Sequence, residues 1–402
     1  MSERPNLLSP EVRANPYPLY ARLRREAPVC QAEPRGMWLL TRQEDVLYAL
    51  KHPELFSSSK LAGALHAPWL GGPHPLSSAM SFADPPRHGR LRGLVQQAFT
   101  SNAVSRLEPF IRSVAEPLVA QMLEQRQVDF IQAFAVPLAS SVIGHLMGLD
   151  TFLFRRVKRW AEDVVAITSM PAGNTARQQQ VRSSMEELTA YLEEALEARR
   201  HRPQEDIMSA LLQAKVDGEA LTPPELLSFL FLLLAAGLET MVHLMGHAMW
   251  LLRESPEVFA LVRKEPARIP RFLEEMLRYE PPTQGVLRVT TTEVELSGVR
   301  IPEGALVMPL IASALRDERH VRDGDRFDMD RTETTHLAFG HGVHFCLGAP
   351  LARLEARLGL EALLPRCGGL TGRPEQTVWS PALTMRGPVA LPLEVLPIDR
   401  LT

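Results

Sequence analysis

The spacing of hydrophobic residues changes along the chain and predicts where helices and strands lie. Between about Pro86 and Pro281 apolar residues recur three and four positions apart, as in segments 104–124 and 181–200. That is the period of a helix with one buried face. After Pro281 short apolar runs alternate with polar residues and are separated by glycine and proline, which is typical of strands. The pattern predicts a mainly helical protein with small sheets.

Short strands and one long loop complete the predicted elements. Strands are expected at 37–41 in the first third, at 389–396 in the tail, and in three runs after the helical middle, at 294–296, 299–301 and 306–311. An amphipathic helix is expected after Cys346. Segment 57–86 is rich in proline, glycine and serine and is predicted to be a loop. A loop of this length in a compact domain usually has a function.

One predicted helix is apolar on nearly all sides. It starts with Thr222, two prolines and Glu225, the pattern of a capping box, and continues to about Leu252. A membrane span is the alternative, but a mid-helix acid such as Glu239 costs roughly 2.5–3.5 kcal/mol even on a lenient insertion scale. A helix that is apolar all round is otherwise the central helix of a large fold. We therefore predict a core helix whose few polar residues face one another or a cavity.

The composition is that of a folded protein without a strong net charge. The 402 residues are 45% hydrophobic and 23% charged, the usual balance of a globular chain. A net charge of −3 creates no field that would attract nucleic acid or an anionic membrane. No repeat, low-complexity tract or long Gly/Ser linker marks a boundary, so a single domain over residues 1–402 is predicted.

The cysteines and the N-terminal segment indicate a cytoplasmic protein. Cys30, Cys346 and Cys367 are too few and too scattered for a disulfide framework or a zinc site with paired cysteines. The first twenty residues are polar and rich in proline, without the apolar run of a signal peptide or membrane anchor. We expect no membrane anchor.

The strongest chemical signal is a loop rich in glycine around Cys346. The loop reads Phe339-Gly-His-Gly-Val-His-Phe-Cys-Leu-Gly348 and is followed directly by an amphipathic helix. Glycines let the backbone take positive φ and approach a flat ligand closely. The start of the helix directs amide donors at the sulfur and favours the thiolate. On these residues alone the alternative remains that Cys346 is a small buried hydrophobic residue.

This loop resembles the haem-binding loop of the cytochrome P-450 family, whose pattern Phe-x-x-Gly-x-x-x-Cys-x-Gly is met at Phe339, Gly342, Cys346 and Gly348. The resemblance extends over about residues 15–395. It implies an α+β fold, a triangular prism that is mainly α-helical with small β-sheets. Haem b would lie between the central long helix and the helix after the cysteine loop. Cys346 would be the metal ligand, and Phe339, Gly340 and Gly348 would bind the cofactor around it.

An acid and a base on one predicted helix resemble a further motif of the same family. Glu275 and Arg278, three apart on a helix, are by themselves an ordinary surface ion pair. Their place in the chain resembles the family's Glu-x-x-Arg motif with Arg331 as its third member, which implies a buried structural network beneath the haem.

A group of cations is expected at the haem edge. His88 and Arg92, four apart on one helix face, can reach one anion, although such a pair is usually a solvated surface. In the family this pair binds the haem propionates, and Arg288 and His344 match positions with the same task. Four cationic donors suit two carboxylates.

The central helix carries a segment similar to the family's oxygen-activating motif. Ala236 and Gly237 would leave space for dioxygen beside the haem, Thr240 would hold the distal oxygen, and Glu239 would feed protons to it. The alternative is structural: Thr240 bonds its own helix and Glu239 pairs with His243 one turn later. Met241 and Leu315 depart from the residues that are common in relatives.

The resemblance implies a monooxygenase that inserts one oxygen atom from dioxygen into a lipophilic small molecule, namely a fatty acid, terpenoid, steroid or polyketide. The predicted pocket residues are Trp69, Leu70, Val286, Leu287 and Leu383. No Gly-x-Gly-x-x-Gly follows a strand, so electrons are expected from separate proteins. The resemblance implies that these are a ferredoxin and an NAD(P)H-dependent ferredoxin reductase. A monomer is expected. A peroxygenase and a haem sensor or electron carrier are the competing classes, and a structural protein would bind no haem.

Overall fold

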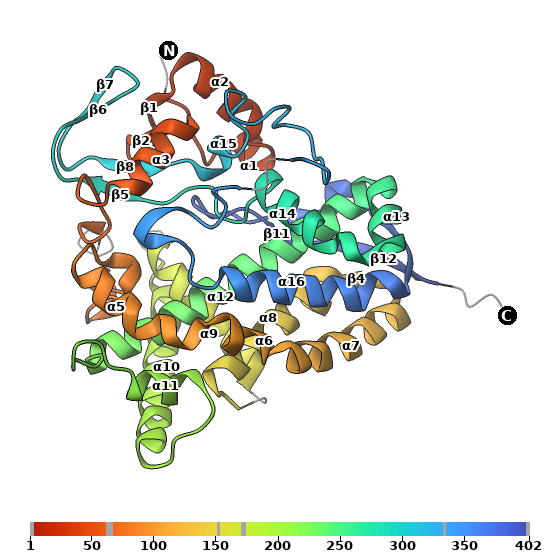
Figure 1. The fold of residues 1–402 in the computed structure, drawn as a ribbon, viewed down its shortest axis with the longest axis horizontal. Helices are drawn as coiled ribbons and strands as arrows, with labels where there is room; N and C mark the ends of the chain where they lie inside the picture. The colour runs from red at the N-terminus through yellow and green to blue at the C-terminus, as the bar shows by residue number, and fades with distance from the viewer. Residues whose placement is uncertain (1–3, 62–66, 151–152, 170–173, 333–334, 399–402) are drawn as a thin grey trace.

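A helix of 32 residues, α12 (Pro223–Glu254), runs through the middle of the computed structural model. The structure describes residues 4–61, 67–150, 153–169, 174–332 and 335–398. The helix begins as predicted, because Oε2 of Glu225 accepts a hydrogen bond from the amide of Thr222 at 3.0 Å. It packs against α8 (Val136–Met147), α9 (Phe154–Ser169), α14 (Ile269–Tyr279) and α16 (Ala349–Leu363). Figure 1 shows α16, in blue, crossing in front of the green α12.

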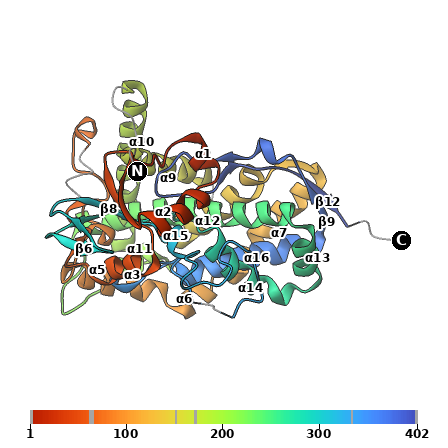
Figure 2. The same ribbon diagram turned by 90° about the horizontal axis from the view of Figure 1, so that it is seen from above.

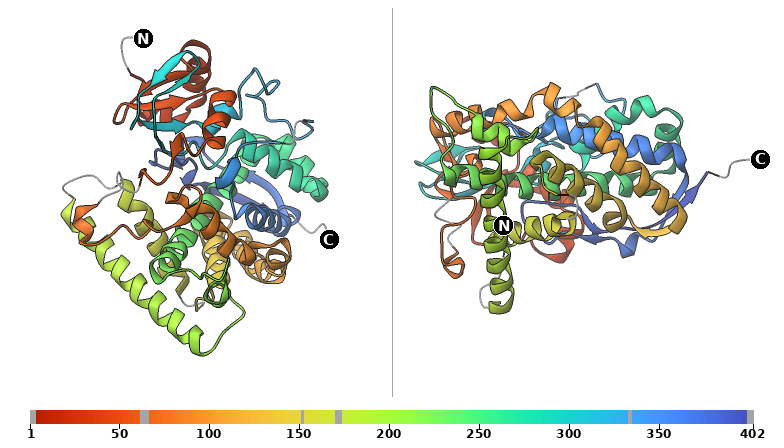
Figure 3. Two further views of the ribbon diagram at one scale, coloured as in Figure 1. Left: turned by 60° about the vertical axis from the view of Figure 1, so that its left-hand side comes forward. Right: turned by 90° about the horizontal axis from the view of Figure 1, so that it is seen from below.

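The remaining helices surround this centre. They are α1 (Pro10–Ala14), α2 (Tyr17–Glu26), α3 (Gln43–Lys51), α5 (Arg87–Gln96), α6 (Ser101–Ser105), α7 (Glu108–Gln125), α10 (Thr175–His201), α11 (Ile207–Gln213), α13 (Pro256–Lys264) and α15 (Ile311–Ala314), with a π-helical turn, η4 (Ile131–Ala135), before α8. In Figure 3 the long α10 runs along one edge of the molecule.

Among the described residues α12 is the one helix that is long and apolar enough to cross a membrane. Most of its apolar stretch is buried against other helices, as in a core helix.

Small sheets lie at two ends of the helical body, as Figures 1 and 2 show. The larger one has five strands in the order β1-β2-β8-β5-β3. Strand β2 runs parallel to β8, with Trp38 opposite Val307, and the other pairs are antiparallel. The strands are β1 (Val29–Ala32), β2 (Met37–Leu40), β3 (Phe56–Ser57), β4 (Gln127–Asp129), β5 (Arg288–Thr290), β6 (Val294–Leu296), β7 (Val299–Ile301), β8 (Leu306–Pro309), β9 (Cys367–Thr371), β10 (Val378–Trp379), β11 (Pro388–Ala390) and β12 (Pro392–Pro397).

Several elements differ from the predicted ones, and a proline explains the first difference. The segment 104–124 forms two helices, because α6 ends at Ser105 and Pro109, which has no amide hydrogen, belongs to the first turn of α7. The tail strand at 389–396 is divided into β11 and β12, which lie in different sheets. The run 306–311 ends as a strand at Pro309. The loop 57–86 contains two short 3₁₀ turns, at Pro68–Leu70 and Met80–Phe82, and its residues 62–66 lie outside the described residues.

The predicted network of Glu275, Arg278 and Arg331 is present and buried. Both carboxylate oxygens of Glu275 accept hydrogen bonds from Arg278, at 2.7 and 2.8 Å, and Nε of Arg331 lies 3.4 Å from Oε1 of Glu275. Arg278 also donates to three backbone carbonyls, those of Leu315, Gly324 and Arg326. The network therefore fastens α14 to the irregular segment that leads towards the cysteine loop.

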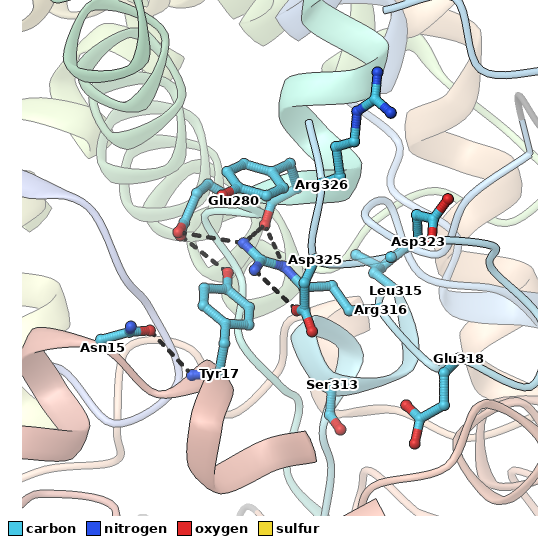
Figure 4. A network of polar contacts seen from close by, with 12 residues as sticks. Asn15, Tyr17, Glu280, Ser313, Leu315, Arg316, Glu318, Asp323, Asp325 and Arg326 are labelled. Atoms are coloured by element: carbon cyan, nitrogen blue, oxygen red, sulfur yellow. Dashed lines mark hydrogen bonds and ion pairs between the residues drawn. The ribbon is translucent and has the colours of Figure 1, made fainter. Parts of the chain in front are cut away.

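A second buried network, drawn in Figure 4, fastens α2 to the end of α14. Oε2 of Glu280 accepts a hydrogen bond from the hydroxyl of Tyr17 at 2.9 Å, and its Oε1 lies 3.5 Å from Nη2 of Arg316. The guanidinium carbon of Arg316 lies 3.2 Å from the centre of the Tyr17 ring. The N-terminal segment is thereby joined to the helical body.

Replacing Arg278 by alanine should lower the free energy of unfolding by about 3–5 kcal/mol, because it leaves the carboxylate of Glu275 buried without its partner. Arg271→Ala is the matched control on the same helix, since its side chain is 72% exposed and its loss should change stability by less than about 0.5 kcal/mol. Urea unfolding followed by circular dichroism measures both. Equal effects of the two variants would contradict a structural role for Arg278.

Candidate active site

A cavity of about 410 Å³ lies between α12, α16, α5, β5 and the cysteine loop. Its wall is largely apolar, with contributions from Phe99, Val142, Phe229, Leu244 and Leu277. Every residue predicted to bind the cofactor lines it, as does Thr240; these residues are His88, Arg92, Ala236, Gly237, Arg288, Phe339, Gly340, His344, Cys346 and Gly348. Residues that lie far apart in the sequence thus meet around one space.

The cysteine loop is tightly turned. Gly340 and Gly342 have φ of +75° and +71°, in the region that side chains rarely adopt. A Cβ atom on Gly342 would lie 2.7 Å from the carbonyl oxygen of Leu50 at the end of α3, so the loop presses against that helix. The amide of Cys346 donates to the carbonyl of Phe339 at 2.9 Å, which closes the loop and directs the cysteine into the cavity.

The sulfur of Cys346 lies at the start of α16. Its exposed surface faces the cavity. Separation from bulk water raises the pKa of the thiol, while the amides of Gly348 and Ala349 and the positive charges of Arg92 and Arg353 act in the opposite direction. These amides belong to the beginning of the helix, where the positive end of its dipole lies. The site thus provides donors for a sulfur anion.

Cationic and imidazole groups gather at one end of the cavity. The rings of His88 and His344 meet edge to face, with their centroids 4.3 Å apart. Arg92 donates to the carbonyls of Val343 and Phe345, at 3.3 and 2.8 Å, and so also supports the cysteine loop. Arg288 is 8% exposed and donates to the carbonyl of Leu287 at 2.7 Å.

These groups form no ion pair with a carboxylate among the described residues, and the acidic charge that acts on His88, Arg288 and His344 is that of Asp84. Among the described residues neither Arg92 nor Arg288 lies within ion-pair distance of a carboxylate. Burial lowers the pKa of Arg288 to about 10, and burial together with the charge of Arg288 lowers the pKa of His344 to about 3. Burial also lowers the pKa of His88. Buried cations without a partner are costly, so this end of the cavity is suited to an anionic ligand such as the two propionates of haem.

The wall formed by α12 carries Ala236, Gly237 and Thr240. The hydroxyl of Thr240 donates to the carbonyl of Ala236, one turn earlier, at 2.6 Å. Gly237 lies close to α8, since a Cβ atom there would lie 2.8 Å from Cδ1 of Ile143 and the end of that side chain would have to shift. Met241, the departure next to Thr240, is buried and lines the cavity as well.

Glu239 does not line the cavity. Its Oε1 lies 3.4 Å from Nε2 of His243, and its side chain is 24% exposed. The structure therefore contains both contacts of the structural alternative, the Thr240 bond to its own helix and the pair of Glu239 with His243. The oxygen-activating role of this segment remains a prediction.

The predicted pocket residues do not gather at one place. Val286 lines the cavity, whereas the neighbouring Leu287 and also Leu383 pack against the core around the N-terminal sheet. Consecutive residues of an extended chain point to opposite sides, which explains why Val286 and Leu287 separate. Trp69 and Leu70 pack against the helical core, and Leu70 lines a second hollow against α10.

Glu355 was missed by the sequence analysis. It lies on α16, is 4% exposed and lines the cavity, and its Oε1 has no hydrogen-bond partner among the described residues. Burial raises the pKa of its carboxyl group to about 8. The sequence does carry a signal for Glu355, because it is a lone acid on the apolar face of the amphipathic helix predicted after Cys346.

The raised pKa of Glu355 predicts a pH dependence of stability. The unfolded chain releases this proton near the ordinary pKa of 4.5 and the folded protein only near 8, so the contribution of Glu355 falls as the pH rises between these values. Relative to Glu355→Gln, the wild type should lose up to about 1.4 kcal/mol per pH unit in this range. Thermal unfolding of both proteins at pH 5.5 and 7.5 measures the difference. Parallel pH profiles would show that Glu355 is ionised in the fold.

Comparison with known proteins agrees with this geometry. The family model of cytochrome P-450 matches residues 163–376. The 6-deoxyerythronolide B hydroxylase of Saccharopolyspora erythraea is 33% identical over 98% of this chain and 100% of its own length. The structure of a cytochrome P-450 from Chondromyces apiculatus superposes with a TM-score of 0.91, at 40% identity and 99% coverage of both chains. Another, from Bacillus megaterium in complex with testosterone, has a TM-score of 0.86 at 32% identity and covers 96% of this chain and 99% of its own.

The predicted fold class, mainly α-helical with small sheets, is thus confirmed. Members of this family bind haem b through a cysteine thiolate, which confirms the predicted cofactor. The relatives are oxygenases, which confirms that the protein is an enzyme of this type. The chain belongs to the cytochrome P-450 family.

Proposed function

We propose that this chain is a monooxygenase in which the thiolate of Cys346 holds the haem iron and one atom of dioxygen is inserted into a lipophilic small molecule. The observation that carries the proposal is the position of Cys346, inside the cavity at the start of α16 and across from the wall formed by α12. Bound haem would supply the activation of dioxygen. The residues of this chain would hold the haem, exclude water and deliver protons.

The cationic end of the cavity would bind the haem propionates. Arg92 and Arg288 supply charge, and the rings of His88 and His344 supply N–H donors. Because these side chains are already in place, little ordering is needed on binding. Phe339, Gly340 and Gly348 would form the surface under the porphyrin, since the glycines bring the backbone close to a flat ligand.

Thr240 and Glu239 would deliver protons at the wall of the cavity that α12 forms. The hydroxyl of Thr240 faces the cavity and can turn from the carbonyl of Ala236 to a ligand there. Glu239, the preceding residue, would return the proton that Thr240 passes on. This role does not need Glu239 in the cavity wall, since its proton travels through the hydroxyl of Thr240.

Electrons would come from separate proteins, a ferredoxin and an NAD(P)H-dependent ferredoxin reductase. Arg353 and Arg357, on the exposed side of α16, are candidate docking cations for an acidic partner. Both already have acidic neighbours: Arg353 bonds Glu274 at 2.6 and 2.9 Å, and Arg357 bonds Glu361 at 2.9 Å. Docking would therefore depend on exchange of these partners. We further propose that the protein acts as a monomer in the cytoplasm.

The wall of the cavity supports an uncharged substrate. Apart from Glu355, its charged or imidazole-bearing wall residues lie at the proposed propionate end, and the wall near α12 and α8 is apolar. One solved relative holds testosterone, and another relative is named for hydroxylation of 6-deoxyerythronolide B. We therefore favour a steroid or a polyketide macrolactone over a fatty acid, whose carboxylate would require a free cation away from the propionates.

A screen for spin-state change tests the substrate class. Steroids and macrolactones should shift the haem from low to high spin, because an apolar ligand displaces water from the iron. Fatty acids and amino acids serve as charged comparison ligands. Saturable shifts with carboxylates alone would contradict the proposed class.

Thr240→Ala should raise the ratio of released hydrogen peroxide to product by at least about tenfold, because the proton donor next to bound oxygen is lost. Thr240→Ser, which keeps the hydroxyl, is the matched control and should change the ratio little. Peroxide and product are measured under NADPH-driven turnover with surrogate redox partners. An unchanged ratio in Thr240→Ala would contradict the role, and turnover of the wild type with peroxide alone would favour a peroxygenase.

A further inference from the structure

A row of buried polar side chains leads away from Glu239. Glu239, His243 and His247 are spaced four residues apart and so share one face of α12. The side chain of Glu239 is 24% exposed and that of His243 3%, and His247 is fully buried. The acid is thus connected to imidazoles that lie in the protein interior.

The row continues on the segment before β11. A Cβ atom on Gly387 would lie 2.3 Å from Cγ of His243, so this segment lies directly against the imidazole. The guanidinium carbon of Arg386 lies 4.0 Å from the centre of the Trp379 ring, and that ring is 5.8 Å from the ring of His247. The charge of Arg386 also acts on the imidazole of His247, so Arg386 follows His247 in the row.

The far end of the row reaches the protein surface. Nε of Arg386 lies 3.5 Å from Oε2 of Glu280, the acid at the centre of the network in Figure 4. Nη2 of Arg386 donates to the carbonyl of Ala14 at 2.9 Å, and Ala14 and Asn15 are exposed. We use "the buried polar row" for Glu239, His243, His247, Arg386 and Glu280.

Several nitrogens of the row have no close hydrogen-bond partner. Among the described residues Nδ1 of His243 has none, its Nε2 has only the 3.4 Å contact with Glu239, and Nε of Arg386 has only the 3.5 Å contact with Glu280. The ring of His247 lies near the backbone of Glu280. Buried polar atoms are almost always paired, by ordered water where protein atoms do not serve. Burial, with the charges of Arg386 and His243, lowers the pKa of His247 well below its ordinary value. A neutral imidazole has one donor and one acceptor nitrogen and can pass a proton through its ring.

We propose that the buried polar row is a proton path that resupplies Glu239 from solvent near Ala14 through the rings of His247 and His243; Arg386 keeps its own proton and holds this end of the row in place. His243 acts through Glu239 and is therefore a positioning residue. The inference rests on the proposed function, since reductive use of dioxygen consumes protons: RH + O₂ + 2e⁻ + 2H⁺ gives ROH + H₂O, with electrons from the ferredoxin. Hydrogen peroxide brings its own protons and electrons, because RH + H₂O₂ gives ROH + H₂O.

Replacing His243 by asparagine tests the path. The amide keeps a donor beside Glu239 but cannot pass a proton from one atom to another. The ratio of dioxygen-driven to peroxide-driven product formation should fall by at least about tenfold, part of the roughly 10²–10⁴-fold that positioned proton transfer contributes, and the solvent deuterium isotope effect should rise. A steric or positioning role alone would leave both unchanged, and that result would overturn the proposal. His243→Gln is the second variant if the first does not fold.

The chain offers a matched control on its surface. His201 and Glu197 form the same pair, four apart on α10, with Nε2 3.1 Å from Oε1 and a His201 side chain that is 80% exposed. His201→Asn should leave the ratio at the wild-type value. A fall as large as that of His243→Asn would show that the effect is not specific to the row.

A spectroscopic measurement checks the contact without turnover. In protein labelled with ¹⁵N-histidine, reduced and bound to carbon monoxide, the His243 imidazole signal is the one lost in His243→Asn. Glu239→Gln should shift that signal, and no shift would overturn the pairing on which the path depends.

If a spin-shifting substrate gives no product with dioxygen or with peroxide, the proposed function fails. If product forms and the ratio is unchanged in His243→Asn, only the proton path fails.

Discussion

The contact on which the proposed chemistry depends is that between the sulfur of Cys346 and the first amides of α16. A thiolate inside a cavity is unfavourable unless donors and positive charge surround it. The amides of Gly348 and Ala349 and the charges of Arg92 and Arg353 provide them here. Much of the surrounding structure keeps this sulfur in place.

Several distant parts of the chain converge on the loop that carries the sulfur. The carbonyl of Leu50 from α3 leaves no room for a side chain at Gly342, and Arg92 from α5 binds the loop carbonyls. Beneath it, the network of Arg278 ties α14 to the segment that leads into the loop. The fold is thus a rigid frame for one reactive atom, which suits a site whose geometry must not change when a ligand binds.

Much of this could be predicted from the sequence because its signals are local. The turn chemistry of the glycine-rich loop, the capping box of α12 and the alternation of β6 and β7 each depend on residues close together in the chain. The meeting of His88 with His344 was expected only through the family resemblance, since no local pattern joins residues 256 positions apart. Leu287 packs against the core around the N-terminal sheet and its neighbour Val286 lines the cavity, a difference that local sequence does not reveal because neighbouring residues of an extended segment point to opposite sides. Glu355 and the row beyond His243 were missed because burial of a polar residue is decided by its tertiary neighbours.

The absorption spectrum of the reduced protein with carbon monoxide tests the central claim most directly, because the band position depends on whether a thiolate holds the haem iron. The account predicts the red-shifted band of a thiolate-ligated haem in the wild type and in Cys30→Ser, and its loss in Cys346→Ser. An unshifted band in the wild type, or a red-shifted band that survives in Cys346→Ser, would contradict the assignment of Cys346 as the iron ligand.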